Sequence, residues 1–106
     1  MRNLRSTLED LTAVAGVDGA GVLLPTRQCL KEGSKQSEVD SALRLLKDSH
    51  QLMTLHQLEP QYALWNFQHG WLWSLAIDGH IYAVVSKTDS KDCPADQLFD
   101  IIQQGR

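Results

Sequence analysis

Histidine and cysteine are the residues of this sequence whose chemistry is most easily recognised from type and spacing. His50 and His56 lie six residues apart in a predicted helix, so their side chains point about 120° away from each other. His69 and His80 lie in or beside predicted turns. No HxxxH, HxH or paired Cys/His spacing occurs, and these are the spacings that metal sites use. We therefore expect no metal and no cofactor.

A catalytic nucleophile is equally hard to place. Cys29 falls on a short predicted strand, and no pattern joins it to a histidine or carboxylate, although the fold could still bring such a pair together. With Cys93 far away in sequence and no CxxC pair, we expect two free thiols in a reducing compartment. The segment GVDGAG is not a GxGxxG phosphate loop, and the carboxylates are scattered over different elements. The sequence therefore predicts a protein that is not an enzyme.

Aromatic residues are concentrated in the second half of the chain. Six of the seven lie between Tyr62 and Tyr82, in a stretch that has no Lys or Arg from Glu59 to Ser86. Proteins that stack single-stranded nucleic acid on aromatic rings pair those rings with basic residues. The net charge of −3 also argues against a nucleic-acid partner. We interpret these aromatic residues as core together with a face that binds a protein partner.

The length of 106 residues fits one globular domain, residues 1–106. The first ten residues contain acidic side chains and no apolar run, so we expect no signal peptide. The uncharged stretch after Glu59 is too polar for a membrane-spanning helix, and we expect no membrane insertion. A cytoplasmic location is the resulting expectation.

The first third of the chain predicts a helix followed by a hairpin. Leu4, Leu8, Leu11 and Val14 follow a helical spacing, with Asn3 as the N-terminal cap and Gly16 as the left-handed end. The segment VDGAGVLLP then indicates a strand ending at Pro25, and residues 28–32 a second strand. The glycines of DGAG would let another backbone or a helix approach closely.

A long helix is predicted from Glu38 to about Gln57, with Ser37 and Asp40 forming a capping box. It carries two apolar stripes. One contains Val39, Leu43, Leu46 and Met53 with His50 in the same row, and the other contains Leu45, Leu52 and Leu55. The second stripe predicts either a broad core face or a second partner surface.

From Tyr62 to Ser86 the apolar period changes to two, with breaks at His69-Gly70 and Asp78-Gly79. This pattern predicts three antiparallel strands, apolar on both faces, before a last helix around Leu98, Ile101 and Ile102. The predicted fold is α+β in the order α-β-β-α-β-β-β-α. A five-stranded antiparallel sheet has the long helix on one face and the terminal helices on the other.

The segment LEDLTAVAGVDGAGVLLPTRQCL resembles the opening of Roadblock / dynein light chain domains, which share the profilin-like architecture. The long helix and the meander ending in DGHIYAVVS also match that family's pattern, so the resemblance covers nearly the whole chain. One departure is the turn after the first strand. Many members have acidic or glycine residues there, and this chain has Pro25-Thr26-Arg27.

The resemblance implies a noncatalytic homodimer, or a heterodimer with a Roadblock paralogue, in which the long helices pair and the third strands meet edge to edge. The predicted interface residues are Leu45, Leu52, Leu55, Tyr62, Leu64 and Asn66. Bacterial and archaeal members associate with small Ras-like GTPases, so the predicted function is a scaffold that binds and regulates a small GTPase or related signalling complex. Arg5, Arg27 and Arg44 are the arginines available to such a partner, and one sequence does not choose among them.

Two alternatives stay open. The first is a small-ligand sensor of profilin-like or PAS-like architecture, which would need a cavity of about 300 Å³ or more between the sheet and the long helix. The second is a small, acidic, dimeric secretion chaperone, whose usual arrangement has three strands before the central helix. The sequence predicts two.

Overall fold

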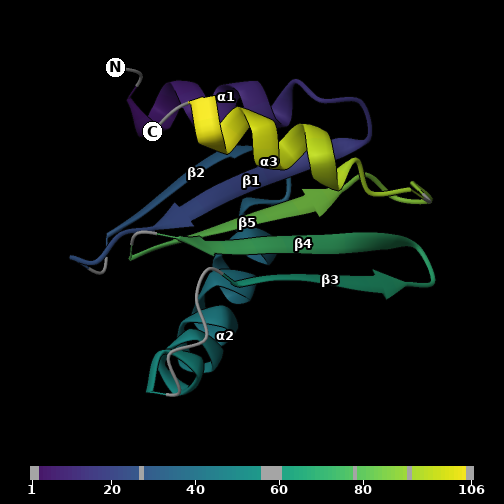
Figure 1. Cartoon of the computed structure of the whole chain (residues 1–106). Helices are drawn as coiled ribbons and strands as arrows, with labels where there is room; N and C mark the ends of the chain where they lie inside the picture. The colour runs from purple at the N-terminus through teal and green to yellow at the C-terminus, as the bar shows by residue number, and fades with distance from the viewer. Residues whose placement is uncertain (1–2, 27, 56–60, 78, 91, 105–106) are drawn as a thin grey trace.

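The computed structural model describes residues 3–26, 28–55, 61–77, 79–90 and 92–104, and it describes the side chains of these residues except 47–55 and 61. Three helices and five strands follow in the order predicted from the sequence, with boundaries that differ by a few residues (Figure 1). They are α1 (Leu4–Thr12), β1 (Val17–Leu23), β2 (Cys29–Gly33), α2 (Gln36–Leu55), β3 (Gln61–Phe67), β4 (Gly70–Ile77), β5 (His80–Ser86) and α3 (Ala95–Gln104). The protein therefore has the predicted α+β fold.

The five strands form one antiparallel sheet in the order β2-β1-β5-β4-β3. The first hairpin and the meander join where β1 pairs with β5. Helices α1 and α3 cover one face, and α2 covers the other, so the structure has three layers (Figure 1). Strand β3 lies at one edge of this sheet.

The two ends of α1 show one confirmed and one wrong prediction. Asn3 caps the helix, because its side-chain oxygen accepts a hydrogen bond from the Ser6 N–H at 2.8 Å. The helix ends at Thr12, with Ala13 as the C-cap in a right-handed conformation, and Gly16 does not end it. Gly16 has φ of +88° in the turn that leads into β1. Its carbonyl accepts the Lys87 N–H there at 2.8 Å. The left-handed glycine was predicted, but its role is to start the strand.

The capping box predicted for α2 is also wrong. The helix begins at Gln36, so Ser37 already lies inside it and donates its hydroxyl to Glu38 instead of capping. The carboxylate of Asp40 forms ion pairs with Lys31 at 3.4 Å and with Arg44 at 3.1 Å, so it is not a cap of the helix. The two residues of the predicted cap therefore make other polar contacts, Ser37 within α2 and Asp40 with both β2 and α2.

The period-two alternation correctly assigns the two faces of the meander. Trp71, Trp73 and Leu75 pack with the buried residues of α1 and α3. Ala76 and its neighbours on β5 pack with Val39, Leu43 and Leu46 of α2 (core residues Leu23, Val39, Ala42, Leu43, Leu46, Ala76, Ile81 and Ala83). Both faces of the central strands are covered, as their apolar sequences indicate.

Glycines allow α2 to lie close to the sheet, as predicted. A Cβ at Gly21 would lie 2.5 Å from Val39 Cγ1 and 3.1 Å from Leu43 Cδ1. A Cβ at Gly19 would meet the Ser34 carbonyl oxygen, with Val39 Cγ2 at 3.2 Å. Within the described part of the chain, no helix is long and apolar enough to span a membrane.

Candidate interaction surface

The edge strand β3 is the most exposed apolar element of the protein. Four of the six exposed large hydrophobic side chains of the described chain belong to it: Tyr62, Leu64, Trp65 and Phe67. Tyr62 is 69% exposed and Phe67 is 63% exposed. Residues 61–77, which contain β3 and β4, have no Asp, Glu, Lys or Arg. Edge strands that remain unpaired usually carry charges that discourage pairing, so this edge has the properties of an interaction site.

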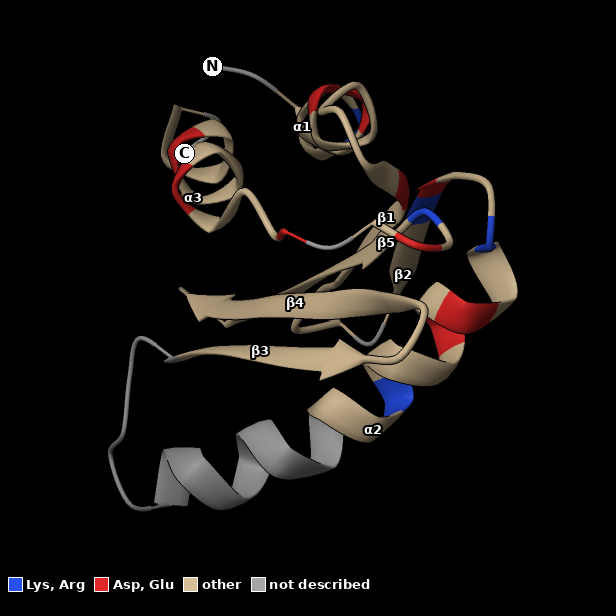
Figure 2. Cartoon of the chain, turned by 90° about the vertical axis from the view of Figure 1, so that its right-hand side faces the viewer, with Lys and Arg blue, Asp and Glu red and all other residues tan. Residues whose placement is uncertain are grey.

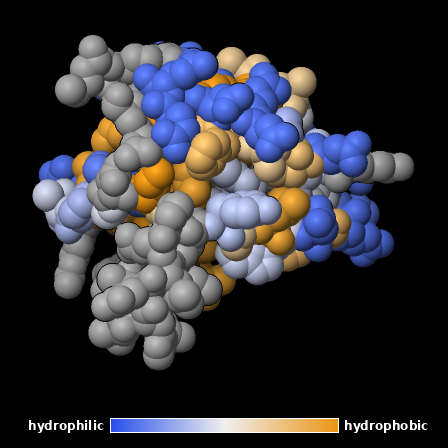
Figure 3. Space-filling model, in the orientation of Figure 1, coloured by the Kyte–Doolittle hydropathy of each residue, from blue (hydrophilic) through white to orange (hydrophobic). Residues whose placement is uncertain are grey.

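Among the described residues, the helices pack mainly on β1, β2 and β5, and most side chains of β3 are exposed. Helix α2 packs mainly on β1 and β5, and then on β2, while α1 packs on β1 and β2. The turned view shows α1 and α3 on one side of the sheet and α2 on the other (Figure 2). In the space-filling view, orange and pale side chains reach the surface along β3, below the blue side chains of α3 (Figure 3).

The register with β4 assigns each side chain of β3 to a face. Residues directly opposite in an antiparallel pair point to the same side of the sheet. Tyr62, Leu64 and Asn66 lie opposite Leu75, Trp73 and Trp71, so these three point to the α1/α3 side. Trp65 lies opposite Leu72, and with Phe67 it points to the α2 side. The strand residues of the predicted interface therefore all lie on the face that α2 does not cover.

Leu45 lies on the α2 side. It is 67% exposed, and helical spacing places it on the same flank of α2 as Glu38 and Ala42. Both of these residues line a groove with Phe67, so this flank of the helix borders the β3 side of the sheet. The side chains of Leu52 and Leu55 lie outside the described residues. The structure thus places Leu45 on the same side of the sheet as Trp65 and Phe67, and on the opposite side from Tyr62, Leu64 and Asn66.

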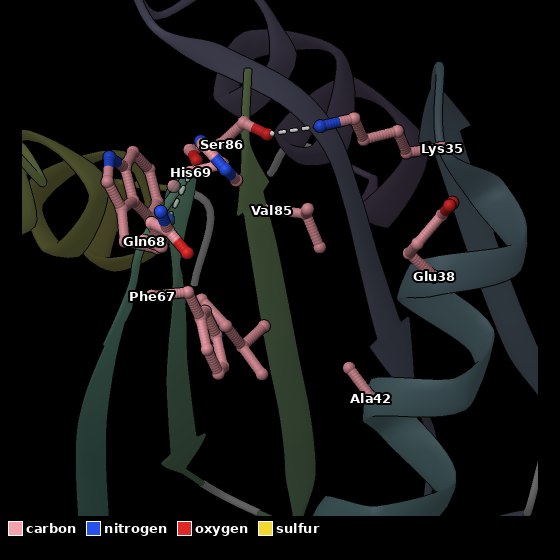
Figure 4. Close-up of a pocket in the computed structure, with 11 residues that line it drawn as sticks. Lys35, Glu38, Ala42, Phe67, Gln68, His69, Val85 and Ser86 are labelled. Atoms are coloured by element: carbon pink, nitrogen blue, oxygen red, sulfur yellow. Dashed lines mark hydrogen bonds between the residues drawn. The ribbon is translucent and has the colours of Figure 1, made fainter. Parts of the chain in front are cut away.

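The groove lies between the first half of α2 and the β3–β4 hairpin, and its volume is about 410 Å³ (Figure 4). Ala42, Phe67, Leu72 and Val85 give it an apolar lining (the others are Lys35, Glu38, Gln68, His69, Gly70, Trp71 and Ser86). Its size lies within the range of small-molecule sites. The groove is continuous with the exposed side chain of Phe67, which makes it part of the β3 surface.

Lys35 closes one end of the groove and is held in place by its contacts. Its Nζ donates to the Ser86 carbonyl at 3.0 Å and to the Thr88 hydroxyl at 3.4 Å, and it forms an ion pair with Asp18 at 3.6 Å. The residue has φ of +54°, a conformation that L side chains rarely adopt. These three oxygen partners occupy the donors of the ammonium group, so Lys35 shapes the groove more than it offers a free cation.

No group of three or more His, Cys, Asp or Glu side chains that could hold a metal occurs among the described residues. His69 Nδ1 lies 3.1 Å from Asp89 Oδ1, but both side chains are well exposed. Cys29 and Cys93 are free thiols, and burial raises the pKa of Cys93 to about 11, so it is a thiol at neutral pH.

The structure distinguishes two of the three arginines. Arg5 is bound by Glu32, whereas Arg44 pairs with Asp40 on its own helix and keeps 81% of its side chain exposed. Arg27 lies outside the described residues. The sequence did not lead us to place Trp65 and Phe67 on the α2 side of the sheet. The signal was present, because the break at His69-Gly70 fixes the hairpin and the alternation of side chains along the strand then assigns each residue to a face.

Comparison with known proteins does not assign a family: no protein-family model matches the chain, and no curated protein matches it. Function therefore has to be inferred from the surface itself.

Proposed function

We propose that the protein is a noncatalytic, dimeric interaction module of the Roadblock type that binds and regulates a small Ras-like GTPase or a related signalling complex. The observation that carries the proposal is the uncharged edge strand β3, whose described large apolar side chains are exposed. Such an edge exposes unpaired main-chain hydrogen-bonding groups together with apolar side chains. The same edge of a second copy would pair with these main-chain groups and cover these side chains.

In the proposed dimer the β3 strands of two copies pair, and the α2-side surface packs against its symmetry mate. A twofold interface uses the same surface on both copies, so the exposed side chains of Leu45, Trp65 and Phe67 would be buried in each copy. Two strands precede α2. This order supports the Roadblock arrangement over the secretion chaperone, which has three strands before its central helix.

We propose that the protein regulates a GTPase by shifting the balance between its conformations. A dimer face that binds the switch regions in one conformation raises the fraction of GTPase in that conformation. Among the described arginines, Arg44 is exposed enough to reach a partner, whereas Arg5 already binds Glu32. The test measures GTP hydrolysis by a cognate GTPase with and without this protein. An unchanged rate would contradict activation and would support a scaffold role only.

The dimer is tested by light scattering on wild type and on a Leu45→Asp, Trp65→Asp double variant. We expect the wild type to have twice the chain mass of 11.9 kDa, and the variant to have the chain mass with its fold intact. Each substitution places a charge in an apolar interface on both copies, which opposes association strongly. Phe99→Asp is the matched control, because Phe99 is 39% exposed, like Trp65 at 38%, and lies on α3. A monomeric wild type at high concentration would refute the proposal.

The groove favours one second candidate, the small-ligand sensor. The groove lies between the sheet and the long helix. Its volume of about 410 Å³ exceeds the minimum of about 300 Å³ that a small-ligand site needs. A sensor would show a ligand-dependent rise in melting temperature that Ala42→Trp, which fills the groove, abolishes. In a dimeric module, the same substitution would alter self-association instead.

A further inference from the structure

The two edge strands of the sheet, β2 and β3, differ in charge. Lys31 and Glu32 lie on β2, where Lys31 pairs with Asp40 of α2 and Glu32 pairs with Arg5 of α1. Charged side chains on an edge strand discourage pairing with another chain. Strand β3 contains no Asp, Glu, Lys or Arg. The edge of β3 is therefore the one suited to accept a further strand.

One hydrogen bond of β4 shows which main-chain groups of β3 face the open edge. The Trp71 N–H donates to the Ser86 hydroxyl on β5 at 2.8 Å, so it points away from β3. Asn66 faces Trp71 in the register of β3 and β4. Pairs of facing residues in an antiparallel ladder alternate between exchanging both main-chain hydrogen bonds and exchanging none. Asn66 and Trp71 are therefore a pair without such bonds, and the N–H and C=O of Asn66 point to the open edge.

The same orientation recurs at every second residue of β3. The register with β4 runs along the strand without a shift, so Leu64 and Tyr62 share the orientation of Asn66. The hairpin turn gives the same assignment, because Phe67 and Gly70 close a two-residue turn and such residues form a hydrogen-bonded pair. The open edge thus presents the main-chain N–H and C=O groups of Tyr62, Leu64 and Asn66.

This spacing selects one register for a second copy of the strand. Antiparallel strands form hydrogen bonds only where outward-facing residues meet, so a slip by one residue is excluded. With Leu64 opposite Leu64 of the second copy, Tyr62 meets Asn66 at both ends, and all three outward residues of each strand are bonded. A slip by two residues in either direction leaves one outward residue of each strand without a partner in β3.

The register centred on Leu64 also matches side-chain sizes on the α2 side of the sheet. Trp65 then faces Ala63 of the second copy, in a pair without main-chain hydrogen bonds, and in such pairs the side chains lie closest. Trp65 is 38% exposed and Ala63 is partly buried, so an indole ring would cover a methyl group twice, once in each direction. Among the three registers, Trp65 meets an alanine only in this one.

We infer that two copies of the chain pair through β3 in the antiparallel register in which Leu64 faces Leu64 and Trp65 faces Ala63. This inference deepens the proposed function and rests on it, because it assigns the groups that meet in the proposed dimer. The twofold axis passes beside Leu64. A partner strand fits this edge when it carries the same three outward main-chain groups and a small residue where Trp65 arrives.

Disulfide cross-linking tests the register on a background of Cys29→Ala with Cys93→Ala, which removes the native thiols. Facing hydrogen-bonded residues have Cα atoms about 5.5 Å apart, which a disulfide spans, whereas diagonal neighbours are about 7–8 Å apart, which is too far. We therefore expect copper-phenanthroline oxidation to cross-link Leu64→Cys chains into dimers on a non-reducing denaturing gel. The matched controls Ala63→Cys and Trp65→Cys, each oxidised alone, should lack the dimer band.

A mixture of Tyr62→Cys and Asn66→Cys chains tests the same register at exposed positions. The mixture should cross-link, because these residues face each other across the axis, and neither variant should cross-link alone. Light scattering under reducing conditions first establishes the mass of each variant.

A dimer in which Ala63→Cys or Trp65→Cys links to itself would overturn the register and leave the dimer standing. A dimer in which none of these variants cross-links would show that association does not use the β3 edge. A monomeric wild type would refute both this inference and the proposed dimer.

Discussion

Gly21 determines how closely α2 approaches the sheet, and replacing it by alanine should cost a predictable amount of stability. The new Cβ would lie 2.5 Å from Val39 Cγ1, whereas ordinary contacts between carbon atoms are about 3.5–4.0 Å. The helix or the Val39 side chain must therefore move by about 1 Å. Overpacking of this kind costs about 1–3 kcal/mol, and the lower entropy of the unfolded chain returns about 0.4–1 kcal/mol. We expect a net loss of about 1–2 kcal/mol.

The cause of the loss can be isolated with a second substitution. Val39→Ala removes the methyl group that the new Cβ meets, and alone it should cost about 2 kcal/mol because Val39 is fully buried. Together the two changes should cost less than their sum by about 1 kcal/mol, which is a coupling energy between residues in contact. Gly19→Ala is the matched control. Its Cβ meets the Ser34 carbonyl oxygen of the backbone, which Val39→Ala does not remove.

Urea unfolding at one fixed protein concentration measures these free energies, with the buried Trp71 and Trp73 as fluorescence probes. A loss of 1 kcal/mol corresponds to a fall in melting temperature of about 4–8 °C for a domain near this size. The reasoning is refuted if Gly21→Ala and Val39→Ala add within about 0.5 kcal/mol, or if Val39→Ala relieves Gly19→Ala equally well.

Two further predictions concern single groups. Asn3→Ala should lower the free energy of unfolding by about 1 kcal/mol, because the Ser6 N–H loses its acceptor, and Asn3→Ser should restore most of it in the same urea assay. For Cys93, an unfolded thiol with a pKa near 9.0 ionises before the folded one, whose pKa burial raises to about 11. The unfolded state therefore binds fewer protons in that interval, so stability should fall as pH rises from about 9 to about 11. Cys93→Ala should lack this loss, and an identical pH profile for that variant would show that another group titrates.

The sequence predicted the fold well wherever the physical cause is local. Period two and the breaks at His69-Gly70 and Asp78-Gly79 imply the meander, because side chains alternate across a strand and turns need these residues. The covering of both faces followed from the largely apolar residues on both faces of β4. The helix ends were less predictable, since the carboxylate of Asp40 binds Lys31 on β2 and that contact exists only in the folded chain.

The candidate site divides along the same line. The absence of Asp, Glu, Lys and Arg from residues 61–77 can be read from the sequence alone, and it indicates a candidate interaction surface. Tertiary structure decided that β3 is at the edge, that Leu45 shares a side with Trp65 and Phe67, and that Tyr62 and Leu64 lie on the opposite side with Leu75 and Trp73. The physical reason is that strand order, register and helix placement depend on contacts between residues far apart in the chain. A local pattern specifies which side chains share a face, and only the packed layers specify what lies beside that face.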